Sequence, residues 1–209
     1  MGKKIYDISQ ALRPGIPVWP GDVHFKQSWT MQLDANCPVN VSELSLSAHT
    51  GSHADAPLHY ANGAVSSGQL DLEPYLGPCQ VIDARRAGAL VRVEDIEERL
   101  LSRSERVIFK TYEAFPHAQW DSDFTAIDPA TIDLLAAKGC LLVGLDSPSL
   151  DPETSKELPS HQRVLAHDMR VLEGLVLDDV PEGLYELIAL PLKLTGGDAS
   201  PVRAVLREV

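Results

Sequence analysis

Short apolar runs alternate with amphipathic stretches along most of the chain, and this alternation predicts strands and helices in turn. Strands are expected over five apolar runs, at residues 81–83, 106–110, 140–145, 184–194 and 202–207. Between the first two runs, residues 94–101 place Ile96 and Leu100 on one face of a helix. Strands that are separated by helices favour an α/β domain with a mixed β-sheet.

A second helix carries its own start and stop signals. Asp128 offers a side-chain cap, Pro129 follows at the first helical position, and Gly139 lies where a left-handed C-terminal cap is expected. The helix is therefore predicted to run from Pro129 to Lys138. The Pro- and Ser-rich stretch at 146–160 lacks such a pattern and is expected to be an ordered loop.

The alternation at residues 39–48 changes phase. Val39 and Val41 share one phase, and from Leu44 onward the apolar residues take the other. A β-bulge between Glu43 and Leu44 would produce this change, and bulges often lie beside active sites. An irregular edge strand would produce it equally well.

The length of 209 residues predicts one domain spanning residues 1–209, large enough to fold without disulfides or a structural metal. The 30 acidic residues outnumber the 18 Lys and Arg residues, and the net charge of −12 argues against binding to nucleic acid or to an anionic membrane. The sequence contains neither a transmembrane-length apolar run nor the apolar centre of a signal peptide. Its three scattered cysteines suit reduced thiols, so a cytoplasmic protein is expected.

Three of the seven histidines lie close together in the pattern His-x3-His-x-Asp-x3-His, formed by His49, His53, Asp55 and His59. Chance rarely produces such a run, and core packing explains it poorly. Imidazole and carboxylate donors suit Zn²⁺, Mn²⁺ or Fe²⁺. The interrupting Gly51 favours a strand-and-loop placement over a helix with two histidines on one face. Asp55 is able to bind one ion and to offer its second oxygen to another.

Two histidines and one aspartate fill only part of a catalytic metal shell. Four later residues are candidates for the remaining ligands: His161, His167, Asp168 and Glu173. His24 and His117 stand alone and are expected at the surface or in structural roles. The motifs of serine hydrolases, dinucleotide-binding proteins and P-loop proteins do not occur, so metal chemistry is the strongest functional signal.

The metal-dependent cyclase superfamily carries the signature H-x-G-T/S-H-x-D-x-P-x-H, and residues 49–60 (HTGSHADAPLHY) resemble it. Four further stretches resemble its bacterial kynurenine formamidase (arylformamidase) branch, at residues 7–22, 71–85, 144–152 and 195–206. Within them, the elements WPGD and DSPS point to this branch. The resemblance implies a barrel-like mixed sheet flanked by helices. It also implies hydrolysis of N-formyl-L-kynurenine to L-kynurenine and formate, a step in tryptophan degradation.

The resemblance further implies a ligand set. His49, His53 and Asp55 match the ligands of a first metal. Asp55 and Glu173 match two bridging carboxylates, and His161 matches the histidine of a second metal. Glu173 is followed by glycine where many members of the superfamily have asparagine, which weakens the local match but keeps the ligand. The implied cofactor is a pair of zinc ions, with Mn²⁺ as the alternative, in each subunit of a homodimer. His167 and Asp168 have no counterpart among the family's ligands and are expected to be structural.

His59 matches the general acid/base of the family, and Trp19 matches an aromatic residue that contacts the small-molecule substrate. The spacing allows this role, because His59 follows Asp55 by four residues across Pro57 and a near-neutral imidazole is suited to moving protons. Two other hypotheses stand beside the formamidase: a metal hydrolase of a small cyclic amide such as isatin, and a non-catalytic metal-binding protein. A tetramer is an alternative to the dimer, and Trp19 serves either its own site or that of a neighbouring subunit.

Overall fold

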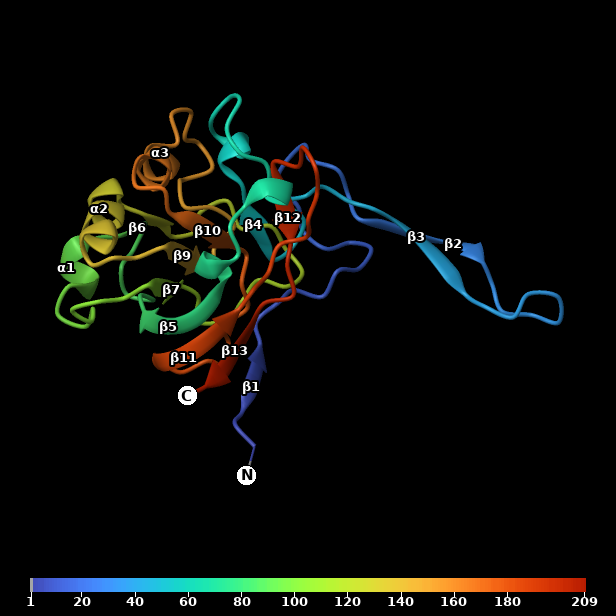
Figure 1. The fold of residues 1–209 in the computed structure, drawn as a ribbon, viewed down its shortest axis with the longest axis horizontal. Coiled ribbons are helices and arrows are strands. Elements are labelled where there is room, and N and C mark those ends of the chain that lie inside the picture. The colour runs from blue at the N-terminus through green and yellow to red at the C-terminus, as the bar shows by residue number, and fades with distance from the viewer. Residues whose placement is uncertain (1) are drawn as a thin grey trace.

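The computed structural model describes residues 2–209, and Figure 1 shows a body built on a curled sheet, from which a two-stranded arm extends. The strands are β1 (Ile5–Asp7), β2 (Lys26–Met31), β3 (Val41–Ser45), β4 (His53–Asp55), β5 (Leu76–Asp83), β6 (Leu90–Val91), β7 (Arg106–Lys110), β8 (Ala126–Ile127), β9 (Leu142–Leu145), β10 (Arg170–Glu173), β11 (Gly183–Ile188), β12 (Ala199–Pro201) and β13 (Val205–Glu208). The helices are α1 (Val93–Ile96), α2 (Pro129–Ala137) and α3 (Pro159–Ala166), with short 3-10 helices η1 (Pro57–His59), η2 (Ser67–Gln69) and η3 (Glu73–Tyr75).

Nine strands form one mixed sheet in the order β1-β13-β11-β5-β7-β9-β10-β4-β12. The central strands β5, β7, β9 and β10 run parallel, and each crossover between them contains one of the three α-helices. The outer strands pair antiparallel. This arrangement confirms the predicted α/β class with a curled, mixed sheet. No helix within residues 2–209 is long and apolar enough to span a membrane.

The central strands are buried on both faces because their apolar residues alternate between two cores. Val81 and Ile108 belong to a core on the face away from the helices. Their neighbours Ile82 and Phe109 pack on the other face, in a core that Leu135 of α2 also joins. Such continuous apolar strands are typical of a parallel sheet that is covered on both faces.

Helix α2 begins and ends close to its predicted caps. The Asp128 carboxylate accepts a hydrogen bond from the backbone N–H of Ala130 at 2.9 Å, and Gly139 has a φ of +79°. Helix α1 is shorter than predicted and ends at Ile96, after which the chain continues in turns. Ile96 and Leu100 are nevertheless both buried, as the helical pattern predicts.

The C-terminal strands are also shorter than predicted. Strand β11 ends at Ile188 because the next backbone N–H donates to the Tyr75 carbonyl and Pro191 has no N–H for a ladder. Strand β13 starts later than expected, since the N–H of Val202 donates to the Ser52 carbonyl instead. The stretch between them forms the separate strand β12, which was not predicted.

The arm consists of β2 and β3, and every residue of both strands is exposed. Its ladder has one irregularity, which lies between Trp29 and Met31 of β2. A bulge between Glu43 and Leu44 is therefore wrong, and the edge-strand interpretation holds. The apolar residues of β3 change phase because neither face of the arm packs against a core (Figure 1).

Candidate functional site

The strand pair β4–β10 presents three of the predicted residues on one face. In the antiparallel register, His53 lies opposite Glu173, and Asp55 lies opposite Val171. Successive side chains of a strand alternate between faces, so His53, Asp55 and Glu173 share one face while Ala54 packs into the core behind them. These three ionisable residues are only 1–4% exposed, a burial that calls for charged partners.

A glycine turn directs the first histidines. Gly51 has a φ of +72°, and a Cβ at this position would lie 2.8 Å from Cδ2 of Leu12. The Gly51 carbonyl accepts a hydrogen bond from Nδ1 of His53 at 2.9 Å, so Nε2 of His53 faces the cluster. His49 lies in the turn before β4. The predicted strand-and-loop placement of His49 and His53, with its bend at Gly51, is confirmed.

Helix α3 brings His161 to the cluster from another part of the chain. The Asp151 carboxylate accepts hydrogen bonds from the backbone N–H groups of Ser160 at 2.9 Å and His161 at 3.0 Å. It also accepts one from Nδ1 of His161 at 2.6 Å, which leaves Nε2 facing Asp55. Asp151 thus positions both the start of the helix and the imidazole ring.

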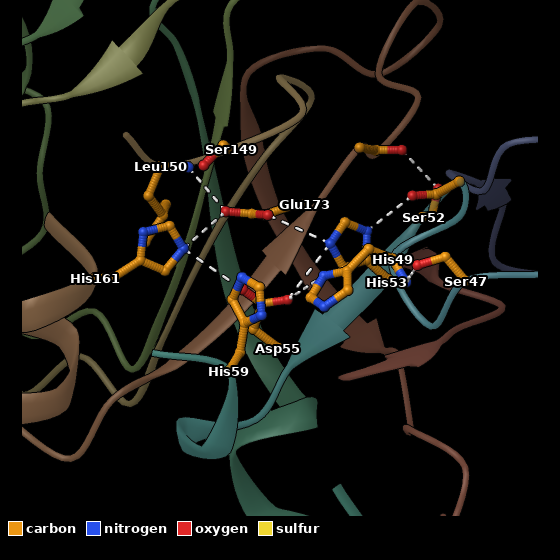
Figure 2. Close-up of polar contacts among 12 residues, drawn as sticks. Ser47, His49, Ser52, His53, Asp55, His59, Ser149, Leu150, His161 and Glu173 are labelled. Atoms are coloured by element: carbon orange, nitrogen blue, oxygen red, sulfur yellow. Dashed lines mark hydrogen bonds and ion pairs between the residues drawn. The ribbon is translucent and has the colours of Figure 1, made fainter. Parts of the chain in front are cut away.

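The carboxylates of Asp55 and Glu173 lie between two sets of histidines (Figure 2). One histidine set is His49 with His53, and the other is His161 alone. Oδ1 of Asp55 lies 3.1 Å from Nδ1 of His49 and 3.4 Å from Nε2 of His53. Oε2 of Glu173 lies 3.3 Å from the same His53 nitrogen. The other oxygens, Oδ2 of Asp55 and Oε1 of Glu173, lie 3.5 Å and 3.3 Å from Nε2 of His161. Each carboxylate therefore faces both sets.

This arrangement fits metal ligation. Ligands bound at about 2.0–2.1 Å to a tetrahedral ion lie roughly 3.3 Å from one another, close to the distances seen here. Both oxygens of Asp55 and Nε2 of His161 are buried without a hydrogen bond among the described residues, which a bound cation would satisfy. Burial alone would raise the pKa of Asp55, but His161 and His49 hold it well below its usual range. Burial alone would lower the pKa of His49, yet Asp55 and Asp198 raise it to about 9.

His59 lies beside the cluster at the end of η1, and its side chain is 35% exposed. Its ring centre is 4.2 Å from that of His49 and 6.4 Å from that of His161. Nδ1 of His59 is 3.5 Å from Oδ2 of Asp198, an oxygen that also accepts a hydrogen bond from Nε2 of His49 at 3.1 Å. His59 is thus next to the ligand sets but more open to solvent than the predicted ligands.

A cavity of about 350 Å³ opens beside the cluster, and the histidines form its polar end. Trp19 lies in its wall, with its ring centre 5.4 Å from Trp120 and 6.4 Å from Phe124. Tyr112 and Phe115 add further aromatic surface. Trp19 therefore borders the cavity of its own subunit.

The DSPS element lies where β9 ends, next to this cavity. The Asp146 carboxylate accepts hydrogen bonds from the backbone N–H groups of Thr111 and Tyr112 and from the Thr111 hydroxyl. These bonds join the carboxyl ends of β7 and β9 and hold Tyr112 at the cavity wall. Ligands are usually bound at this end of parallel strands.

The structure brings together six predicted site residues. The cluster is formed by His49, His53, Asp55, His161 and Glu173, and His59 lies beside it. The two remaining candidates, His167 and Asp168, are exposed, and so are His24 and His117, which the sequence places at the surface or in structural roles. Two neighbours of the cluster, Asp151 and Asp198, were not identified as functional from the sequence. Both lie within stretches that carry the family resemblance, but no spacing links them to the histidine motif.

Comparisons with known proteins agree with this geometry. Residues 6–152 match the model of a family described as putative cyclase. A curated kynurenine formamidase of Sphingopyxis alaskensis is 53% identical over 206 residues, covering 99% of each chain. A solved structure described as a predicted metal-dependent hydrolase from Bacillus stearothermophilus has a TM-score of 0.86 and 29% identity, covering 100% of both chains. Isatin hydrolase A from Labrenzia aggregata, with 23% identity, shares the fold at a TM-score of 0.83 over 99% of this chain and 94% of its own.

The curled sheet and the buried cluster of histidines and carboxylates define a protein with a candidate metal centre at the carboxyl ends of its parallel strands. The family match covers more than half of the chain, and the match to the formamidase covers nearly all of it. The chain therefore belongs to the cyclase family, in the group that contains the curated kynurenine formamidases.

Proposed function

We propose that this protein is a kynurenine formamidase, which hydrolyses N-formyl-L-kynurenine to L-kynurenine and formate in tryptophan degradation. The observation that carries the proposal is the position of Asp55 and Glu173, each facing both histidine sets at the polar end of an aromatic cavity. Shared carboxylates of this kind are typical of hydrolytic sites with two metals. The identity to the Sphingopyxis enzyme supports the choice of substrate.

The proposed ligands of one ion are His49 and His53, and that of the other is His161, while Asp55 and Glu173 belong to both. Zinc is the proposed metal because imidazole and carboxylate are its usual donors at catalytic sites, and Mn²⁺ is the alternative. When bound, the ions polarise the formyl carbonyl and lower the pKa of water.

His59 is the proposed general acid/base. As water adds to the formyl carbon, His59 accepts a proton, and it delivers this proton to the aryl amine nitrogen as the C–N bond breaks. The products are the free amine and formate. The partial exposure of His59 and its place between the ligand sets and the solvent support this role.

The aromatic wall is proposed to orient the substrate. Trp19 packs edge-on against Trp120 and Phe124, which restrains its ring at the cavity surface. An aryl ring stacked on Trp19 would gain about 0.5–1.5 kcal/mol beyond the burial of its surface. The formyl group would then point toward the histidines.

Hydrolysis of a small cyclic amide such as isatin is the second candidate function, and the shared fold with isatin hydrolase A favours it. The deciding experiment measures turnover of N-formyl-L-kynurenine and of isatin by one zinc-loaded preparation. A formamidase is expected to turn over the open-chain substrate and to leave isatin largely intact. Turnover of isatin alone would replace the proposal, and turnover of neither substrate would favour a metal-binding protein without catalysis.

A homodimer is proposed because the arm exposes a large apolar surface. Trp29 and Met31 are each 53% exposed, and Leu33 at its tip is 62% exposed. Surfaces of this kind usually mark an interface, and a second copy of the chain is the proposed partner. Size-exclusion chromatography with light scattering tests this, since a monomer at micromolar concentration would contradict it.

A cytoplasmic location is proposed because all three cysteines are free thiols.

A further inference from the structure

We propose that Asp198 is a positioning residue, which holds the acid/base His59 and the metal ligand His49 in one fixed arrangement. The inference rests on the proposed function, because it assigns proton transfer to His59. Asp198 belongs to neither ligand set, and the family resemblance described above assigns no role to it.

The backbone of Asp198 is tied to the strand that carries the ligands. Its carbonyl accepts a hydrogen bond from the N–H of Ala56 at 2.9 Å. The next residue, Ala199, begins β12 and lies opposite Asp55 in the antiparallel β4–β12 pair. The distance of Asp198 from the cluster is therefore set by a strand ladder rather than by a free loop.

The turn before Asp198 is also anchored. The N–H of Gly68 donates to the Leu194 carbonyl at 2.9 Å, and the N–H of Ser67 donates to the Gly197 carbonyl at 2.8 Å. A Cβ on Gly68 would lie 2.8 Å from the Leu194 oxygen, and one on Gly197 would lie 2.7 Å from Oγ of Ser67. Both glycines thus permit a close packing that holds the turn in place.

A single oxygen of Asp198 reaches both histidines. Oδ2 accepts a hydrogen bond from Nε2 of His49 at 3.1 Å, which leaves Nδ1 of His49 to face Asp55. The same oxygen lies 3.5 Å from Nδ1 of His59, which leaves Nε2 of His59 as the nitrogen available for proton transfer. The ring centres of His49 and His59 are 4.2 Å apart, so a shift of Asp198 would disturb both rings.

This geometry predicts two separable effects of removing the carboxylate. Through His49, the affinity for zinc is expected to fall about tenfold, as is common when the partner of a ligating histidine is lost. Through His59, kcat at saturating zinc is expected to fall roughly 10–100-fold, because a misplaced acid/base group transfers protons poorly.

The test compares Asp198→Ala, Asp198→Asn and the double variant Asp198→Ala/His59→Ala with the single variant His59→Ala. Zinc binding is measured by titration of the metal-free proteins, and kcat on N-formyl-L-kynurenine is measured at saturating zinc. Asp71→Ala, which removes an exposed carboxylate that belongs neither to the cluster nor to the cavity wall, is the matched control. Thermal unfolding verifies that each variant is folded.

The expected result is a loss of kcat in Asp198→Ala that largely disappears when His59 is already alanine, because the two residues act together. Asp198→Asn, which keeps an acceptor oxygen, is expected to recover part of the loss. An unchanged kcat, or an equal loss in both backgrounds, would overturn the assignment to His59. Unchanged zinc affinity would overturn the assignment to His49. If the wild type does not hydrolyse the substrate, the proposed function fails, while the zinc titration still decides the role toward His49.

Discussion

Asp55 and Glu173 lie on neighbouring strands, and each turns one carboxylate oxygen toward His53 and the other toward His161. The four oxygen–nitrogen distances lie between 3.3 and 3.5 Å. The β4–β10 ladder sets the spacing of the two carboxylates, since Glu173 pairs with His53 two residues from Asp55. The backbone therefore prearranges the site, and the side chains need little adjustment to receive cations.

Replacing Asp55 by asparagine is expected to remove metal binding and activity together. The change replaces one of the two carboxylate oxygens by an amide NH₂, so one histidine set loses its facing oxygen, and it removes a buried negative charge that both sets share. Metal content after dialysis, measured by atomic absorption, should drop to background, whereas the exposed control Asp71→Asn should keep its metal. An Asp55→Asn protein with full metal content would show that this carboxylate does not bridge.

Replacing His59 by alanine is expected to separate turnover from metal binding. If His59 only moves protons, kcat should fall about 10²–10⁴-fold, the usual worth of a general acid/base, while metal content stays unchanged. Steady-state kinetics and metal analysis on the same sample give the answer. Loss of metal in this variant would make His59 a ligand, in line with its closeness to His49 and Asp55.

Replacing Asp151 by asparagine is expected to weaken zinc binding through His161. The Asp151 carboxylate holds Nδ1 of His161 at 2.6 Å, and loss of such a partner commonly costs about 10–100-fold in metal affinity. Zinc titration of the metal-free protein measures this. Asp128→Asn is the matched control, because Asp128 caps α2 in the same manner without a histidine. Equal zinc affinity in both variants would limit Asp151 to a helix cap.

Removing the α-carboxylate of the substrate is expected to change kcat/KM by less than about tenfold, or about 1.4 kcal/mol, because the described part of the cavity wall offers it no cationic partner. Among residues 2–209, the cavity lining contains no Lys or Arg, whereas Asp22 and Asp121 lie in its wall. The measurement compares N-formyl-L-kynurenine with its decarboxylated analogue. A loss greater than a hundredfold would show that a cation outside this lining binds the carboxylate.

The sequence predicts elements whose signals are local. Strand β7 has the predicted bounds because Arg106–Lys110 is a continuous apolar run with polar ends. Helix α2 has near-predicted bounds because Asp128 and Gly139 act on adjacent backbone groups. The histidine motif also predicts its own bend, since Gly51 lies between His49 and His53.

The sequence does not predict features that depend on distant pairing. Asp198 reaches His49 only because β12 adds to the edge of β4, and the three residues of β12 are too few to show a pattern. Asp151 becomes a partner of His161 because the loop after β9 folds back onto α3. The phase change in β3 wrongly suggested a bulge between Glu43 and Leu44. An arm that is exposed on both faces has no core to fix the alternation of apolar and polar residues.

The most direct test of the account measures kynurenine formation from N-formyl-L-kynurenine by one preparation, before chelation, after removal of the chelated metal, and after zinc is restored. A two-metal formamidase is expected to form kynurenine before chelation and to lose this turnover on chelation. It is expected to regain turnover as the second zinc equivalent per subunit binds. Turnover that survives complete removal of the metal would contradict the account, as would its absence from the zinc-restored protein.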